Sequence, residues 1–287
     1  MSKATDTVCE QFPFTVDKFP LSGPDGLSTP WYGMFRSDNS QVVGEGSVTS
    51  RYVPHQTDDV VALVEACENV FDDAVSVKTH FRNGHYVSIA PSNEYRKSIY
   101  GSKDNIFPRL IIRGGYDRRA FSATLGTYRD LCKNLAMFST VQETHQAIRH
   151  TSHLRKNMDE LIAHFQTLKE SWQTLGEMIE RMQNARVQMV DFMKEVYGEP
   201  EDAPRSITIH RNRTEAIFRR LHSERLRSGR RELGRDFEVS AWEAYNAVQG
   251  YTMWDATRKG SPTEFDRMLL ANRDAKVLKA EKLAIAA

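Results

Sequence analysis

The spacing of hydrophobic and polar residues changes once along the chain, soon after residue 128. Before that point, short runs are rich in β-branched and aromatic residues, and several of them alternate apolar with polar positions, as strands do. These runs cover residues 31–36, 41–52, 74–82, 85–90, 106–113 and 121–128. One helical run lies among them at residues 58–71, where Val60, Val64 and Cys67 share a face. The first half therefore predicts a mainly antiparallel sheet that carries a helix.

Turn-forming residues separate several of the predicted strands. The Ser-Asp-Asn-Ser cluster at residues 37–40 predicts a hairpin between the strands on either side of it. Asn83 and Gly84 form the strongest short-range signal for a hairpin, and residues 114–117 predict a further turn.

Residues 1–30 carry four prolines and two glycines. This density predicts an irregular N-terminal arm that packs on its own domain or on a neighbour. A partly disordered tail is the alternative interpretation.

After Leu154 the apolar positions follow one another at alternating steps of four and three residues. They are Leu154, Met158, Leu161, Phe165, Leu168, Trp172, Leu175, Ile179, Met182, Met189, Met193 and Val196, with Arg186 standing where an apolar residue is due. This heptad pattern predicts a long helix or helical hairpin over residues 151–197, with Gly176 as a candidate kink. The apolar seam needs a partner, and the spacing does not distinguish another helix of this chain from a second subunit of a homo-oligomer.

The remaining sequence predicts a second group of helices. An acidic linker with proline and glycine occupies residues 198–204, and an arginine-rich, aromatic helical part follows at residues 205–287. With the β-rich core at residues 31–150, the fold class is α+β: an antiparallel sheet with a packed helix, followed by long helices.

The composition argues against a wholly basic protein, a disulfide-rich secreted protein and a membrane-spanning protein. The 287 residues suffice for one large domain or two modest ones, and the formal net charge is only +1. The three cysteines are far apart and suggest no disulfide framework, so we expect a reducing cytoplasm. We find neither a signal peptide nor an apolar run long enough to span a bilayer, so no membrane partner is expected.

Catalytic and metal-binding motifs are not found. The sequence contains no P-loop, no G-x-G-x-x-G, no H-E-x-x-H and no G-x-S-x-G. On a helix His150 and His153 would share a face, but His145 would point away, so no metal site is predicted. Cys132 has no identifiable base beside it, and a buried structural role is the better interpretation. We therefore assign no catalytic residue, metal ligand or cofactor.

The strand-like first half and the helical second half of the chain meet at residues 121–134. Residues 121–128 predict a strand, and a helical pattern begins at Arg129. Free backbone N–H groups at such a helix start can bind an anion. For Arg129 and Asn134 the simplest role is structural: a hydrogen bond at the helix start, and an ion pair of Arg129 with Asp130 or another nearby acid.

Cationic residues are the positive signal for a binding function. Between residues 109 and 133, cations alternate with aromatic residues, as in sites that bind single-stranded nucleic acid through phosphate contacts and base stacking. The candidate residues in this stretch are Arg109, Arg113, Tyr116, Arg118, Arg119, Tyr128, Arg129 and Lys133. The alternative is that the aromatic residues belong to the core and the charges to a solvated rim.

A second cationic stretch occupies residues 205–235. It holds ten arginines, three glutamates and no lysine, which gives +7 against +1 for the whole chain. Such a run suits a phosphate backbone, with Arg219 and Arg220 as candidate contacts. The alternative is a solvated face whose arginines pair with neighbouring acids. Membrane-surface binding is disfavoured, because no wide apolar face opposes the arginines.

Three segments resemble the phage/plasmid-like protein family, which carries a domain of unknown function. They are VGEGSVTSRYV at residues 43–53, LGTYRDLCKN at residues 125–134 and WEAYNAVQGYTMWDATRK at residues 242–259. The chain departs from the family pattern in its heptad segment and its arginine-rich stretch. The resemblance implies a phage or mobile-element origin, a bacterial host cytoplasm and a role close to DNA metabolism, but no established reaction.

These observations lead to two functional hypotheses. The first is a nucleic-acid-binding protein that prefers single-stranded DNA and acts in binding or annealing, assembled as a homo-oligomer through its heptad helices. The comparison with phage annealing proteins rests on architecture alone. The second is a protein-interaction module that inhibits or redirects a host or competing-element factor. An enzyme ranks third, because no acid, base or nucleophile can be assigned.

Overall fold

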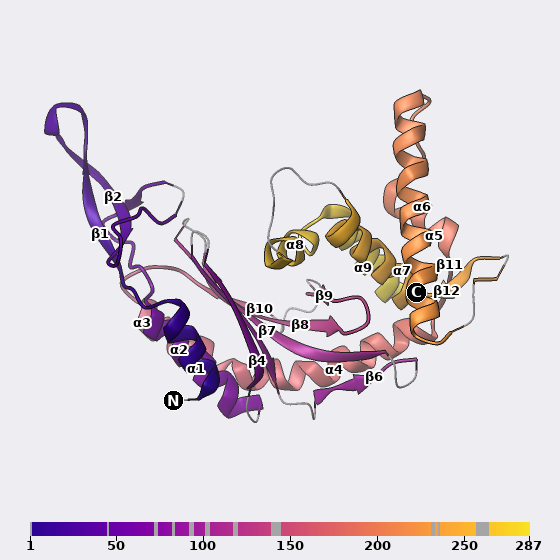
Figure 1. Cartoon of the computed structure of the whole chain (residues 1–287), viewed down its shortest axis with the longest axis horizontal. Helices are drawn as coiled ribbons and strands as arrows, with labels where there is room; N and C mark the ends of the chain where they lie inside the picture. The colour runs from indigo at the N-terminus through magenta and orange to yellow at the C-terminus, as the bar shows by residue number, and fades with distance from the viewer. Residues whose placement is uncertain are drawn as a thin grey trace. The chain divides into compact units, whose positions relative to one another are not determined.

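The computed structural model describes residues 2–44, 46–71, 74–81, 84–91, 95–100, 104–116, 120–138, 145–230, 233–234, 236–256 and 264–287 (Figure 1). Antiparallel sheets and helices both contribute, so the fold is α+β as predicted. The chain forms two compact units. Unit 1 contains Met1–Tyr95, Pro108–Gly126 and Gln142–Ser171, and unit 2 contains Arg96–Phe107, Thr127–Val141 and Trp172–Ala287. Strands β7 (Asn105–Gly115) and β8 (Phe121–Arg129) and helix α4 (Phe165–Asn184) contribute residues to both units.

The N-terminal region of unit 1 is regular, so the predicted irregular arm is wrong. Helix α1 (Lys3–Gln11) begins at Ser2, whose hydroxyl caps the N–H of Thr5. Strand β1 (Val16–Ser22) then pairs with β2 (Ser28–Arg36) around the 3-10 turn Pro24–Gly26. Pro20 is tolerated because β1 is an edge strand and needs no ladder hydrogen bond on its outer side.

Strand β2 also pairs with β3 (Val48–Thr49), which gives the three-stranded order β1-β2-β3. The predicted pairing of residues 31–36 with residues 41–52 is therefore confirmed. The longer partner of β2 is nevertheless β1, which lies inside the segment predicted to be irregular.

The larger sheet has the order β10-β8-β7-β5-β4 in the described part of the chain. Strands β4 (Ala74–Phe81) and β5 (Gly84–Pro91) are antiparallel neighbours, as the hairpin signal predicted, and β10 covers His145–Ile148. Gly84 has φ 153, and a side chain there would collide with the carbonyl oxygen of Gly114 on the neighbouring strand. Helix α2 (Thr57–Phe71) confirms the predicted helix and buries Val60, Leu63 and Cys67.

Two short strands pair with the portions of β7 and β8 that belong to unit 2. Strand β6 (Lys97–Ser98) pairs with β7, and β9 (Asn134–Ala136) pairs with β8. The helix expected to begin at Arg129 is therefore wrong: β8 ends there and a tight turn follows. Lys133 takes the left-handed φ of 57 in that turn, and the chain then returns as β9.

The heptad segment forms three helices. They are α3 (Leu154–Ala163), α4 and α5 (Met189–Tyr197), and α4 continues unbroken through Gly176. Strand β11 (Arg186–Gln188) pairs with β12 (Glu238–Ser240) at the position where the heptad pattern skips. All twelve heptad residues are buried within the single chain. The seam's partner is therefore this chain, so the seam does not supply an interface for a homo-oligomer.

The C-terminal part of unit 2 is helical, as predicted. Helix α6 (Pro204–Arg227) is followed by α7 (Ala241–Gly250), which is buried along its whole length and starts with a capping box between Ser240 and Glu243. A π-helical turn, η4 (Tyr251–Asp255), leads towards α8 (Glu264–Ala271) and α9 (Ala275–Ala286). Helix α7 packs against both α6 and α9 and thereby forms the centre of this part.

Candidate functional site

The cationic cluster predicted between residues 109 and 133 does not form one exposed surface. In unit 1, Arg109 and Arg113 are buried, with Arg109 donating to Ser88 Oγ at 3.2 Å. Tyr116 is fully buried and donates its hydroxyl hydrogen to the carbonyl of His55 at 2.8 Å. None of these three side chains offers a surface to a nucleic acid in this structure. Arg118 and Arg119 lie outside the described residues.

Arg129 lies in the interior of unit 2, where it is only 2% exposed. Its guanidinium group forms ion pairs with Asp104 and Glu224, each with an N···O distance of 2.6 Å. Of the partners predicted for Arg129, Asp130 is wrong, because it binds Arg96 at 2.9 Å on the surface, whereas the structural ion pair with other acids is found. Burial by itself would lower the pKa of Arg129, but Cys132 and the two buried carboxylates raise it. Arg129 is thus a permanent internal cation that neutralises buried acids.

Cys132 is buried beside this ion-pair cluster, Tyr128 is buried against Phe107, and Lys133 is exposed in the following turn. Burial and the charge of Glu224 raise the pKa of the Cys132 thiol to about 12. The thiol is therefore neutral at ordinary pH, and it approaches the Arg129 guanidinium at 3.8 Å. This environment supports the structural interpretation of Cys132 and gives it no nucleophilic character.

Two of the segments that resemble the phage/plasmid-like family, residues 125–134 and 242–259, contact each other through buried hydrogen bonds in unit 2. Asn134 donates to the backbone carbonyl of Asn246 at 3.1 Å and accepts from the indole of Trp254 at 3.0 Å. Gln249 and Asn272 both donate to the carbonyl of Leu135. Asn134 therefore connects a strand to α7 and η4 and does not start a helix. These segments therefore help to maintain the fold of unit 2.

Helix α6 carries the largest group of exposed cations that the structure describes near the predicted sites. Pro204 starts it, and none of residues 204–216 is buried. Arg205, Arg211 and Arg219 are exposed, and within the described residues they form no ion pair. Their guanidinium groups are free to bind phosphate groups bidentately.

The second half of α6 uses its arginines differently. Arg220 pairs with Asp255 at 2.8 Å and lies 3.7 Å from Glu224 on the next turn. Arg225 pairs with Glu243 at 2.7 Å. The two predicted contacts on this helix therefore separate: Arg219 faces solvent, whereas Arg220 belongs to the ion-pair cluster.

A surface pocket of about 450 Å³ lies at the start of α6. It is lined by Tyr197, Glu199, Pro200, Glu201, Ala203, Arg205, Ser206, Ile209, His210 and Arg213. The guanidinium of Arg213 stacks 4.4 Å from the centre of the Tyr197 ring, which fixes it beside the helix. The pocket combines both signs of charge. Ser206 Oγ accepts from the backbone N–H of Glu201 at 3.1 Å, and among the described lining residues no hydrogen bond joins Ser206 to His210.

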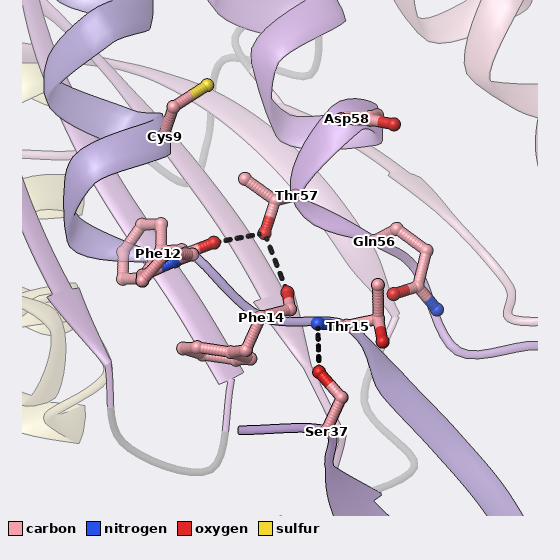
Figure 2. Close-up of a pocket in the computed structure, with 9 residues that line it drawn as sticks. Cys9, Phe12, Phe14, Thr15, Ser37, Gln56, Thr57 and Asp58 are labelled. Atoms are coloured by element: carbon pink, nitrogen blue, oxygen red, sulfur yellow. Dashed lines mark hydrogen bonds between the residues drawn. The ribbon is translucent and has the colours of Figure 1, made fainter.

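A second pocket, of about 330 Å³, opens in unit 1 beside α1 and α2 (Figure 2). Thr57 donates its hydroxyl to the carbonyls of Phe12 and Phe14, so its polar group is already used internally. Burial and the nearby carboxylate of Asp58 raise the pKa of Cys9. The thiol is therefore not activated, and the pocket shows no basis for chemistry.

Unit 1 also contains a buried group of histidines. His55 Nε2 and His85 Nδ1 share a hydrogen bond of 2.9 Å, and the His55 ring stacks on Tyr116. Burial lowers the pKa of both imidazoles, that of His85 to about 3. His150 is buried nearby and His153 is exposed, while the side chain of His145 lies outside the described part. Among the described residues, no three potential ligands are grouped to hold a metal ion.

Comparison with known proteins identifies a family but no function. The model of a domain of unknown function, DUF932, matches residues 45–277. This match covers most of the chain, which therefore belongs to the DUF932 family. No curated protein and no solved structure matches significantly. No helix among the described residues is long and apolar enough to cross a membrane.

Proposed function

We propose that this DUF932 protein binds nucleic acid through the exposed arginines of α6, in a phage or other mobile element. The proposal rests on one observation: along α6, Arg205, Arg211 and Arg219 are exposed, and within the described residues they form no ion pair. Unpaired, exposed guanidinium groups along one helix suit a phosphate backbone, because each contact releases condensed counterions. The excess of arginine over acid in residues 205–235 points the same way.

The binding surface is thus expected on α6 and not on strands β7 and β8. Arg109, Arg113 and Arg129 are buried, and so are Tyr116 and Tyr128. Phosphate contact and base stacking by these residues would need them at the surface. The binding assay decides between the preference for single-stranded DNA expected from the sequence and duplex binding, and the annealing role needs a separate strand-annealing assay. Homo-oligomerisation would have to use a surface other than the buried heptad seam.

Fluorescence anisotropy with labelled single-stranded and duplex oligonucleotides tests the proposal. We expect the triple variant Arg205→Ala/Arg211→Ala/Arg219→Ala to bind at least tenfold more weakly than the native chain at about 0.1 M salt. The slope of log K against log salt should fall in magnitude by roughly two to three, because up to three phosphate contacts are lost.

The matched control removes three exposed cations elsewhere, in Arg155→Ala/Lys156→Ala/Lys279→Ala. The control has the same net charge as the α6 variant, so it should retain nearly native affinity if binding is local to α6. Equal losses of affinity in the two variants would show that the effect comes from net charge alone. Unchanged binding in the α6 variant would refute the proposal.

The alternative, a protein-interaction module, is favoured by one observation on the β1–β2 hairpin. Phe19 and Trp31 are 53% and 43% exposed, and Phe19 contacts Phe35 on the neighbouring strand. Exposed aromatic residues of this kind are common at protein interfaces. A stoichiometric complex with a host protein that resists nuclease and is lost in Phe19→Ser/Trp31→Ser would support this alternative.

A further inference from the structure

We propose that the first half of α6 enters the major groove of duplex DNA and reads base edges, an inference that rests on the proposed nucleic-acid function. Residues 204–216 contain no buried side chain, whereas Ile217, Leu221 and Glu224 pack the second half into unit 2. Figure 1 shows the start of α6 extending beyond α7 and α9 of the same unit. This exposed segment is about 20 Å long at 1.5 Å per residue.

The dimensions of a free helix match one particular ligand. An α-helix with its side chains is about 10–12 Å across, and the major groove of B-DNA is about 12 Å wide. The face of α6 that runs from Arg205 to Arg219 is exposed, so it can enter the groove and reach base edges. The opposite face lies beside Tyr197 and does not need to enter the groove. The major groove of A-form RNA is too narrow for side chains to read, which favours DNA.

One face of α6 carries residue types that read bases. At alternating steps of three and four, it presents Arg205, Thr208, Asn212, Glu215 and Arg219, and all five are exposed. Helical spacing places this stripe opposite the packed face. Arginine pairs with guanine, asparagine with adenine, and glutamate accepts from cytosine, while threonine suits several base edges.

Glu215 distinguishes base readout from simple phosphate tracking. A carboxylate in the middle of a cationic stripe would weaken contact with phosphates everywhere along a strand. At the floor of the groove the same carboxylate can accept a hydrogen bond from cytosine N4. Arg211 is exposed and lies beside the stripe, where a groove wall would present its phosphates, whereas Arg213 lies towards the packed face and stacks on Tyr197. Ile207 on one flank is 46% exposed and suits contact with a thymine methyl group.

The test separates sequence readout from general affinity. Random duplex and random single-stranded libraries are selected separately on the full-length protein, and the enriched sequences are measured by anisotropy against random controls. We expect the duplex library to yield a short motif bound at least tenfold more tightly than random duplex. Asn212→Ala should remove that preference by about tenfold while leaving random-duplex binding and its salt slope unchanged, because no charge is lost.

Asn184→Ala, at an exposed asparagine on α4, is the matched control and should leave the preference intact. Alanine raises helix propensity, so Asn212→Ala should keep the fold, which circular dichroism would verify. Tighter binding to single strands, the absence of a duplex motif, or a motif that Asn212→Ala does not affect would each overturn the inference while leaving nucleic-acid binding in place. Failure to bind either library at low salt would overturn both proposals.

Discussion

The two halves of α6 use the same residue type for opposite purposes. In the second half, Arg220 and Arg225 lie against the acids of unit 2 and help to fix the helix to α7 and η4. In the first half, Arg205 and Arg211 extend into solvent, and no residue from 204 to 216 is buried. An arginine that neutralises a buried acid stabilises the fold, whereas a free arginine contributes little stability and is available for a ligand. The position of the acids, and not the arginine count, decides between the two roles.

Arg129→Met should show the largest effect of removing an arginine that is paired with buried acids. The variant leaves Asp104 and Glu224 buried without their shared cation, and breaking a buried pair in this way costs about 3–5 kcal/mol. Urea unfolding followed by tryptophan fluorescence should show this loss, because Trp172 and Trp242 report from unit 2. Arg96→Met, which removes a half-exposed ion pair with Asp130, is the control and should cost less than about 1 kcal/mol. Similar losses in the two variants would contradict the structural role of burial.

Unit 1 buries titratable groups in their neutral form, unlike the charged Arg129 cluster of unit 2, so its stability should fall at acid pH. The folded-state pKa values of His55 and His85 lie below the ordinary value of 6.5, that of His85 at about 3. The unfolded chain therefore binds more protons between these values, so stability is full above pH 6.5 and falls as pH decreases. Each histidine should cost up to about 1.4 kcal/mol per pH unit. Hydrogen exchange of the β5 amides between pH 7 and pH 5, corrected for intrinsic rates, measures this loss. Protection that is constant over that range would contradict the neutral pair.

A smaller effect is expected for Arg225→Ala in the second half of α6. Arg225 is partly exposed, and Glu243 keeps a second cation, Arg230. We expect a loss of about 1–2 kcal/mol, typical of a charged hydrogen bond that is only partly replaced. Urea unfolding provides the value, and a loss as large as that of Arg129→Met would show that the cluster depends on Arg225 rather than on Arg129.

The smallest stability effect should come from the exposed arginines of α6. The triple variant Arg205→Ala/Arg211→Ala/Arg219→Ala should unfold within about 0.5 kcal/mol of the native chain, since exposed arginines without partners contribute little. The same variant should lose nucleic-acid binding. A marked destabilisation would mean that these arginines have structural partners and would remove the basis for the contrast.

Much of the fold could be predicted because it depends on local patterns. Helix α2, the β4–β5 hairpin and the buried heptad positions follow from periodicity and turn chemistry. The N-terminal strand β1 was missed because proline counts do not reveal an edge strand. The turn after Arg129 was mistaken for a helix because the left-handed conformation of Lys133 leaves no signal in residue type.

The candidate site could be predicted only in part. The arginine excess in residues 205–235 was visible, but the acids that occupy the second half of α6 include Asp255 and Glu243, whose positions depend on tertiary packing. The same limit explains why Arg109 and Arg113 were predicted as phosphate contacts although both are buried. The spacing of Arg205, Asn212 and Arg219 on one polar face was a signal that could have identified the exposed stripe.

Photo-crosslinking locates the surface of the protein that contacts DNA. A duplex carrying 5-iodouracil is irradiated with the full-length protein, and the crosslinked peptides are mapped by mass spectrometry. If α6 is the contact surface, crosslinks fall within residues 204–219, disappear in the α6 triple variant and remain in the charge-matched control. Crosslinks confined to residues 109–133, or their absence from α6 in a saturated complex, would rule out α6 as the contact surface.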